Sequence, residues 1–278
     1  MEWRIVTDSS CDYVADRKLP DNVKLSEVPF IISVGNKDYV DTEDLNVQEM
    51  LDGMESCAEA SRTTCPSPGV WYEQFEQADR IIAVTISENL SGSYNSAMTA
   101  RKMILEKHPE KKIYILNSRS AGSALAMYVE KALELIEKGC EFEEVVRELD
   151  ELLKHKHTIF ALASFNNLVK NGRVSKVAGF IAGKLGIWGI GIASEIGTII
   201  VKEKVRGEQR ILASFINDMK ENGFAGGYVI ISHCQNIEMA SKLRDSINKV
   251  WKNTKVKILS TGGLCSYYAE RRGMIVAY

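Results

Sequence analysis

Short β-branched runs alternate with longer amphipathic stretches along the first half of the chain. Apolar residues spaced i, i+3, i+4 and i+7 predict helices, and short runs rich in Val and Ile predict strands. The predicted strands are Arg4–Thr7, Val28–Val34, Arg80–Ile86 and Lys112–Leu116. The predicted helices are Val70–Ala78, Ser93–Glu106, Ala121–Lys138 and Glu141–Lys154, with Ser67 and Ser118 as N-cap candidates. This alternation is typical of an α/β domain.

The second half predicts another α/β unit. Its strands are Thr158–Ala163, Ile187–Ala193, Thr198–Lys204, Tyr228–Ser232, Val256–Leu259 and Met274–Ala277, and its helices are Phe165–Lys170, Ile211–Glu221 and Met239–Trp251. A chain of 278 residues has the length of about two domains. We therefore expect an N-terminal α/β domain over residues 1–157 and a C-terminal α/β domain over residues 158–278.

One apolar segment, Val177 to Val201, is long enough to span a bilayer. Lys184 and Glu195 would each be costly near the centre of a membrane helix, and glycines interrupt the run. The segment is better explained as a buried helix followed by strands, so we expect no integral membrane segment.

Composition narrows the classes of partner and ligand. The formal net charge of −2 does not favour nucleic acid, and the N-terminus lacks a basic region followed by an apolar one, so we expect a cytoplasmic protein. The six cysteines are widely spaced and are expected to be reduced thiols. His155 and His157 form the one close histidine pair, without a cysteine or carboxylate cluster, so no metal site is expected.

The usual phosphate-loop, nucleophile-elbow and zinc-protease motifs are absent from the sequence. Hydroxyl-rich turns follow several predicted strands instead: Asp8-Ser9-Ser10, Thr63-Thr64-Cys65-Pro66-Ser67, Ser87 with Ser91-Gly92-Ser93, and Asn117-Ser118. In an open α/β sheet such turns converge on one crevice, where hydroxyls and helix N-termini can hold a carboxylate or a phosphate. Each turn taken singly is also explained as a helix cap.

Several of these motifs resemble those of the DegV family of bacterial fatty-acid-binding proteins. Thr63-Thr64-Cys65-Pro66-Ser67-Pro68 is similar to the family's T-S-x-P-S-P turn, and the stretch from Ile86 to Ala97 is similar to I-S-x-x-L-S-G-T-Y-x-S-A. Asp8 to Asp12, Asn171 to Lys176 and Glu203 to Gly207 resemble three further motifs in the same order. The resemblance therefore covers essentially the whole chain.

The resemblance implies an EDD/DegV-like fold of two α/β domains with a single long-chain fatty acid, such as palmitate, in the crevice between them. By this resemblance Thr63 and Ser93 contact the carboxylate, and the tail lies in an apolar tunnel lined by the C-terminal domain. No cofactor and no catalysis are implied. The protein would act in lipid transport or fatty acid metabolism, presenting the acid to a fatty acid kinase.

The chain departs from the family at one turn. The family's H-T-G-P-G turn is Ser260-Thr261-Gly262-Gly263-Leu264 here, so Ser260 replaces the histidine. The resemblance places this turn near the carboxylate and the kinase-facing surface, so we expect the change to affect phosphorylation by a kinase more than binding.

Two other functions remain open. One is a phosphoryl-transfer or hydrolytic enzyme acting on a small acid in the same crevice, for which the sequence offers no visible base. The other is an interaction module whose surface docks a partner through Arg173 and Arg206, although arginines in such positions also form ordinary surface ion pairs.

Overall fold

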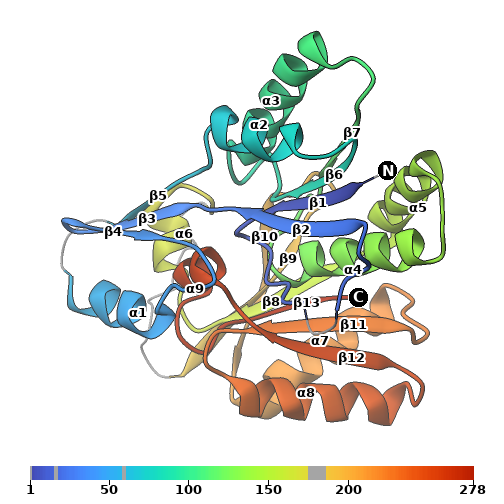
Figure 1. The fold of residues 1–278 in the computed structure, drawn as a ribbon. Coiled ribbons are helices and arrows are strands. Elements are labelled where there is room, and N and C mark those ends of the chain that lie inside the picture. Colours follow the sequence, from blue (N-terminus) through green and yellow to red (C-terminus); the bar gives the residue numbers. More distant parts are fainter. Residues whose placement is uncertain (1, 16–17, 58–60, 175–185) are drawn as a thin grey trace.

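The computed structural model describes residues 2–15, 18–57, 61–174 and 186–278. Figure 1 shows a four-stranded sheet with α2 (Pro68–Glu76) and α3 (Ser93–Lys107) on its outer face, and a six-stranded sheet below it. Helix α4 (Ser123–Glu137) lies between the two sheets and contacts strands of both. The two sheets therefore share one buried layer.

The four-stranded sheet is parallel throughout. Its order is β2 (Val23–Val28), β1 (Trp3–Asp8), β6 (Arg80–Thr85) and β7 (Lys112–Asn117). Strand β6 is apolar on both faces, because α2 and α3 pack on one side and α4 with α5 (Phe142–His155) packs on the other. The parallel arrangement brings the carboxyl ends of these strands to one edge.

The six-stranded sheet is mostly antiparallel, and only β11 and β12 pair in parallel. Its order is β10 (Ile199–Arg206), β9 (Ile187–Ala193), β8 (Thr158–Leu162), β13 (Met274–Ala277), β11 (Tyr228–His233) and β12 (Lys255–Ser260). Ile159 and Ala161 of β8 pack with α7 (Glu208–Glu221) and α8 (Ile237–Val250). Phe160 and Leu162 face the other side of the sheet.

A smaller antiparallel sheet adjoins that second face. It consists of β4 (Lys37–Val40), β3 (Ile31–Val34) and β5 (Arg62–Thr64). It shares a core with α1 (Val47–Ser56), α6 (Asn166–Lys170) and α9 (Gly263–Ala269), and Phe160 and Leu162 belong to the same core. Residues from the first third of the chain thus pack against residues near position 160.

Most predicted elements are confirmed within one to three residues at each end. The single strand predicted over Val28–Val34 is wrong: β2 ends at Val28 and β3 begins at Ile31 in a different sheet. Pro29 has no N–H to donate to a ladder, so the strand cannot continue through it. Ser118 is not a helix N-cap, because α4 begins only after Gly122, which has a φ of 66°.

Residues on the two sides of position 157 build different sheets. The domain boundary near residue 157 stays a prediction. The predicted helix at the start of the apolar segment falls largely within residues 175–185, outside the described residues, whereas the predicted strands after it are confirmed as β9 and β10. None of the helices in the described ranges is long and apolar enough to cross a membrane.

Candidate functional site

An elongated, mainly apolar cavity lies against the face of β8 that carries Phe160 and Leu162. The empty space between its walls amounts to about 820 Å³, a value that includes space open to solvent. Thr158, Phe160 and Leu162 all line it, so this wall alone is about 13 Å long at ~3.3 Å per strand residue. The other described lining residues are Phe30, Thr63, Ile86, Leu90, Ser91, Ser120, Ala121, Leu168, Arg173, Ala193, Gly197, Thr198, Ile199, Leu264, Cys265, Tyr268, Ala269 and Ile275.

Thr63 lies at one polar part of the cavity wall. The edge strand β5 holds it by pairing Thr63 with Ile32, and its hydroxyl lies 2.9 Å from the Tyr268 hydroxyl. Arg173 is close by, with its guanidinium 5.9 Å from the centre of the Tyr268 ring and its Nε donating to the carbonyl of Leu90 at 3.1 Å. A hydroxyl pair and a cation therefore meet here in an otherwise apolar pocket.

The Ser91-Gly92-Ser93 turn lies beside the part of the cavity wall that carries Thr63. Ser91 lines the cavity, whereas Ser93 is fully buried at the first position of α3 and is not among the lining residues. Its hydroxyl donates to Oδ2 of Asp8 at 2.6 Å. Gly92 permits close packing, since a Cβ there would lie 3.3 Å from the sulfur of Cys65. The two turns predicted from sequence thus adjoin one another.

Buried aspartates hold the turns around this region in place. Asp8 accepts hydrogen bonds from the backbone N–H groups of Ser10 at 3.2 Å and Ile86 at 3.0 Å, in addition to Ser93. Burial raises the pKa of Asp8, although the hydrogen bonds oppose that shift. Asp8 therefore joins the turn after β1 to the segment after β6 as one unit.

Two further aspartates hold the start of α9. Oδ1 of Asp12 accepts from the N–H of Gly262 at 3.0 Å, and the two oxygens of Asp41 accept from Gly263 and Leu264 at 2.7 Å each. Burial raises the pKa of Asp12 to about 7 and that of Asp41 to about 6. The turn after β12 is thus held by side chains from the first 41 residues of the chain.

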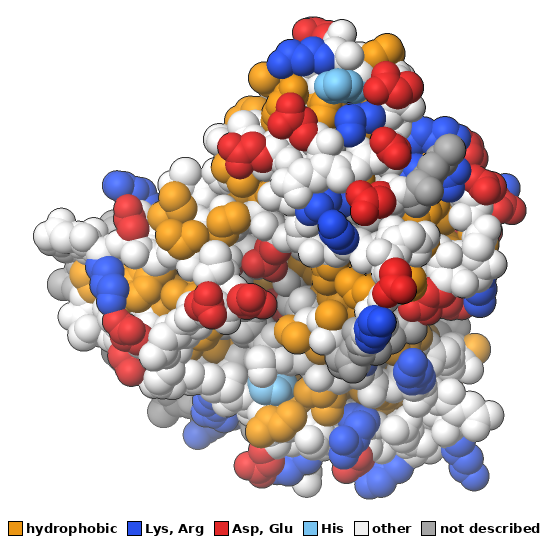
Figure 2. All heavy atoms as spheres, in the orientation of Figure 1, with side chains coloured by type: hydrophobic (Ala, Val, Ile, Leu, Met, Phe, Trp, Pro, Cys, Tyr) orange, Lys and Arg blue, Asp and Glu red, His pale blue; other side chains and the backbone are white. Residues whose placement is uncertain are grey.

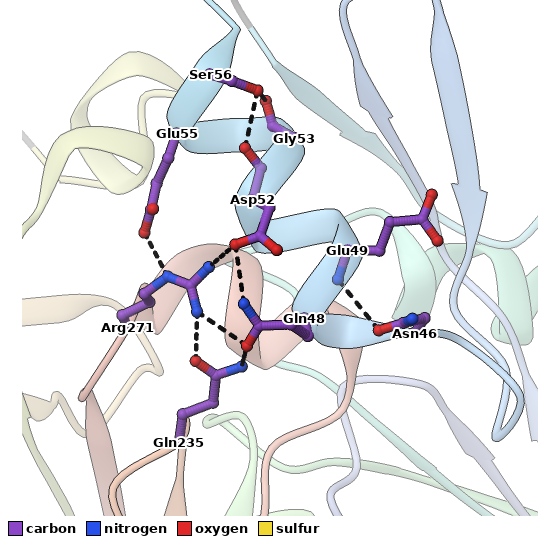
Figure 3. Close-up of polar contacts among 9 residues, drawn as sticks. All are labelled: Asn46, Gln48, Glu49, Asp52, Gly53, Glu55, Ser56, Gln235 and Arg271. Atoms are coloured by element: carbon purple, nitrogen blue, oxygen red, sulfur yellow. Dashed lines mark hydrogen bonds and ion pairs between the residues drawn. The ribbon is translucent and has the colours of Figure 1, made fainter.

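A surface network fixes α1 to the segment after α9 (Figure 3). The Arg271 guanidinium pairs with the carboxylates of Asp52 and Glu55. It also donates to Oε1 of Gln48 at 3.1 Å and to Oε1 of Gln235. Because α1 shares a core with the small sheet that carries Thr63, this network helps to hold that sheet against the rest of the protein.

The structure brings some predicted site residues together and separates others. Arg173 reaches the cavity, but Arg206 is exposed at the end of β10, where it pairs with Ile187. Ser260 is exposed at the end of β12 and is not among the lining residues.

Sequence reasoning missed Tyr268 and assigned no role to Asp41. Tyr268 belongs to no recognised motif, and Asp41 acts on residues more than 220 positions away.

Neither a charged surface patch nor a cluster of metal-binding side chains indicates a second site among the described residues. Acidic and basic side chains are interspersed over the face drawn in Figure 2, as the near-neutral composition suggests. Within the described residues, no three His, Cys, Asp or Glu side chains are grouped so that they could hold a metal ion.

Comparison with known proteins places this arrangement in a family. A family model described as an uncharacterised protein of the DegV family matches residues 2–278. A DegV domain-containing protein of Streptococcus pneumoniae is 39% identical, and the match covers 100% of this chain and 99% of the relative. A DegV domain-containing protein of Streptococcus gordonii is 37% identical over the same shares.

Solved structures agree with this assignment. The fatty acid kinase B3 protein of Streptococcus pneumoniae, crystallised with linoleic acid, has a TM-score of 0.97 and 38% identity, covering 100% of this chain and 99% of its own. A DegV protein of Eubacterium eligens loaded with heptadecanoic acid has a TM-score of 0.93 and 38% identity, covering 99% of this chain and 98% of its own. The chain belongs to the DegV family.

Proposed function

We propose that the protein binds one long-chain fatty acid in the cavity along β8 and acts as a cytoplasmic carrier. The observation that carries this proposal is the shape and chemistry of the cavity, which is elongated and apolar and has hydroxyls beside Arg173 in one part of its wall. An acyl chain gains about 0.8 kcal/mol for each methylene that leaves water, so such a cavity favours a long tail. Similar DegV proteins carry linoleic and heptadecanoic acids.

In this proposal Thr63 and Ser93 hold the carboxylate. Thr63 already lines the cavity, and Ser93 lies two residues beyond the lining residue Ser91. Residues 1–157 then supply the head-group turns, whereas residues 158–278 supply β8, β9 and Ile275 around the tail. Tyr268 and Arg173 of the second half also lie beside Thr63 at the head-group end, so both proposed domains contact the ligand.

The alternative of a hydrolytic or phosphoryl-transfer enzyme has less support. None of the described lining residues is a histidine or a carboxylate, so no general base stands beside a bound small acid. We therefore propose a binding protein that hands its ligand to a partner, and a fatty acid kinase is the partner class indicated by the similar pneumococcal protein.

The proposed kinase surface includes Arg206. It is exposed and distant from the cavity lining, so a charge reversal there spares the ligand site. Arg206→Glu should reduce co-purification with an acyl kinase while fatty acid content stays at the wild-type level. Unchanged co-purification would remove Arg206 from the docking surface.

The first experiment is solvent extraction of the purified protein followed by mass spectrometry. We expect a long-chain acid in roughly one-to-one ratio with the protein, and its absence from protein that also fails to bind added palmitate would refute the proposal.

Thr63→Ala and Ser93→Ala should each weaken binding by about 1–3 kcal/mol, because a buried carboxylate loses a donor. Thr64→Ala and Ser96→Ala are matched controls outside the lining, expected to change affinity by less than ~0.5 kcal/mol.

A further inference from the structure

The hydroxyl of Ser93 carries one hydrogen, and the structure shows where that hydrogen goes. It is donated to Oδ2 of Asp8 across 2.6 Å. While Asp8 is ionised, Ser93 has no second hydrogen to offer a ligand carboxylate. A fatty acid anion arriving at Ser93 would therefore meet an oxygen lone pair rather than a donor.

The Asp8 carboxylate has no cation to balance it among the described residues around it. Its two oxygens accept from Ser10, Ile86 and Ser93. The described groups that interact with it electrostatically are acids: Cys11 follows it on the same turn, Glu27 comes from the neighbouring strand β2, and Asp41 follows β4.

Two further acidic groups lie next to these three. Asp12 and the Cys265 thiol of α9 adjoin Asp41 and Cys11. A ligand carboxylate that reaches Ser93 adds a further negative charge beside these acids, whereas the cation of the cavity wall, Arg173, lies by Tyr268 and Leu90. Like charges at close range in a buried site cannot all remain ionised, so a proton is taken up when they are brought together.

We propose that Asp8 is a positioning residue for the head group, and that binding of an ionised fatty acid is coupled to uptake of one proton from solvent by Asp8. The proton on Oδ2 is then donated to the Ser93 oxygen, while Oδ2 still accepts from the N–H of Ile86. The Ser93 hydrogen is thereby released and donates to the ligand carboxylate. No covalent bond changes, and the net event is one anion bound and one proton bound.

This inference rests on the proposed function and predicts a pH dependence that fatty acid binding alone does not. A free fatty acid in monomeric solution is ionised above about pH 6, so its own titration does not contribute there. If the complex holds one more proton than its free components, the dissociation constant rises about tenfold per pH unit once free Asp8 is ionised. The calorimetric heat of binding also depends on the ionisation enthalpy of the buffer.

The test is titration calorimetry with dodecanoate, at about pH 6.5 to 8.5, in phosphate and in Tris buffers. The wild-type protein should take up close to one proton per ligand. Asp8→Asn should bind dodecanoate without proton uptake and with a dissociation constant independent of pH, because the amide does not take up a proton in this pH range. Asp12→Asn is the matched control: it removes a buried carboxylate that caps Gly262 and does not touch Ser93, so the pH slope should persist.

The outcomes separate the two proposals. Wild-type protein that binds dodecanoate with the same heat in both buffers overturns the proton coupling and leaves the fatty acid function standing. Uptake that persists in Asp8→Asn assigns the proton elsewhere and also overturns the inference. Wild-type protein that binds neither dodecanoate nor palmitate refutes the proposed function itself. If Asp8→Asn does not fold, equal heats of the wild-type protein in the two buffers still overturn the proton coupling.

Discussion

Gly191 on β9 sets the space available to the Phe160 ring, and through that ring the room in the cavity. The two residues face each other across the β8–β9 pair. A Cβ at position 191 would lie 2.3 Å from Cζ and 2.5 Å from Cε2 of Phe160. Since carbon atoms in contact lie ~3.5–4.0 Å apart, Gly191→Ala must displace the ring by more than about 1 Å. Phe165, with its ring centre 6.2 Å from that of Phe160, limits retreat on its side.

The displaced ring should remove room for about one or two methylene groups of the bound chain. At ~0.8 kcal/mol each, this loss weakens binding of the longest acids by roughly 4- to 15-fold and spares shorter ones. Displacement of a fluorescent fatty acid by a series from dodecanoic to octadecanoic acid measures the dependence on chain length. The double variant Gly191→Ala, Phe160→Leu should recover part of the affinity for long acids, because the smaller side chain restores space at position 160. The backbone oxygen of Ile200, 2.8 Å from the added Cβ, still has to shift in both variants. An equal loss for every chain length, unrelieved in the double variant, would refute this account of the cavity wall.

Two predictions concern stability. Gly263→Ala should lower the free energy of unfolding by about 2–4 kcal/mol, because its Cβ would lie 2.4 Å from Oδ1 of Asp41 and would break that cap. Gly69→Ala, at an exposed position of α2 with its nearest contact at 3.7 Å, should be neutral or stabilising in the same urea titration. The protein should also be more stable at about pH 5.5 than at pH 8. Asp12, Asp41 and Glu27 have folded-state pKa values of about 7, about 6 and about 8, above the ordinary 3.8 and 4.5, so the native state binds protons more tightly and loses stability as pH rises through that window. Lys156, whose pKa burial lowers to about 7, opposes this loss, and the net change should be on the order of 2–4 kcal/mol. A higher urea midpoint at pH 8 would contradict this reasoning.

Local sequence signals predicted the elements whose pattern matches their burial. The i, i+3, i+4 stripe of α5 and the apolar runs of β6 and β8 each lie where the pattern indicated. The small sheet and α9 were missed for a physical reason. Strand β5 has three residues, with Thr63 and Thr64 at its end, and is stabilised by pairing with β3 rather than by a hydrophobic pattern of its own.

The candidate site was predictable in part. The hydroxyl-rich turns after β1, β6 and β7 do converge, because they follow parallel strands of one sheet, whereas Thr63 reaches them from β5 of the small antiparallel sheet. The acceptor of the Ser93 hydroxyl could not be predicted from the sequence. Ser93 donates to Asp8, which lies 85 positions away, and no local pattern encodes such a contact. Tyr268 and Arg173 likewise meet Thr63 and Leu90 only through tertiary packing.

The position of β13 has a consequence for how the chain folds as it is synthesised. This strand follows every other described element in sequence, yet it lies inside the six-stranded sheet, between β8 and β11. Until Met274–Ala277 leave the ribosome, β8 and β11 lack their shared neighbour and expose unpaired strand edges. The four-stranded sheet can form much earlier, so a ribosome-bound nascent chain should contain a folded first sheet beside an unfinished second one. Such an intermediate is the species most exposed to aggregation and to chaperone binding.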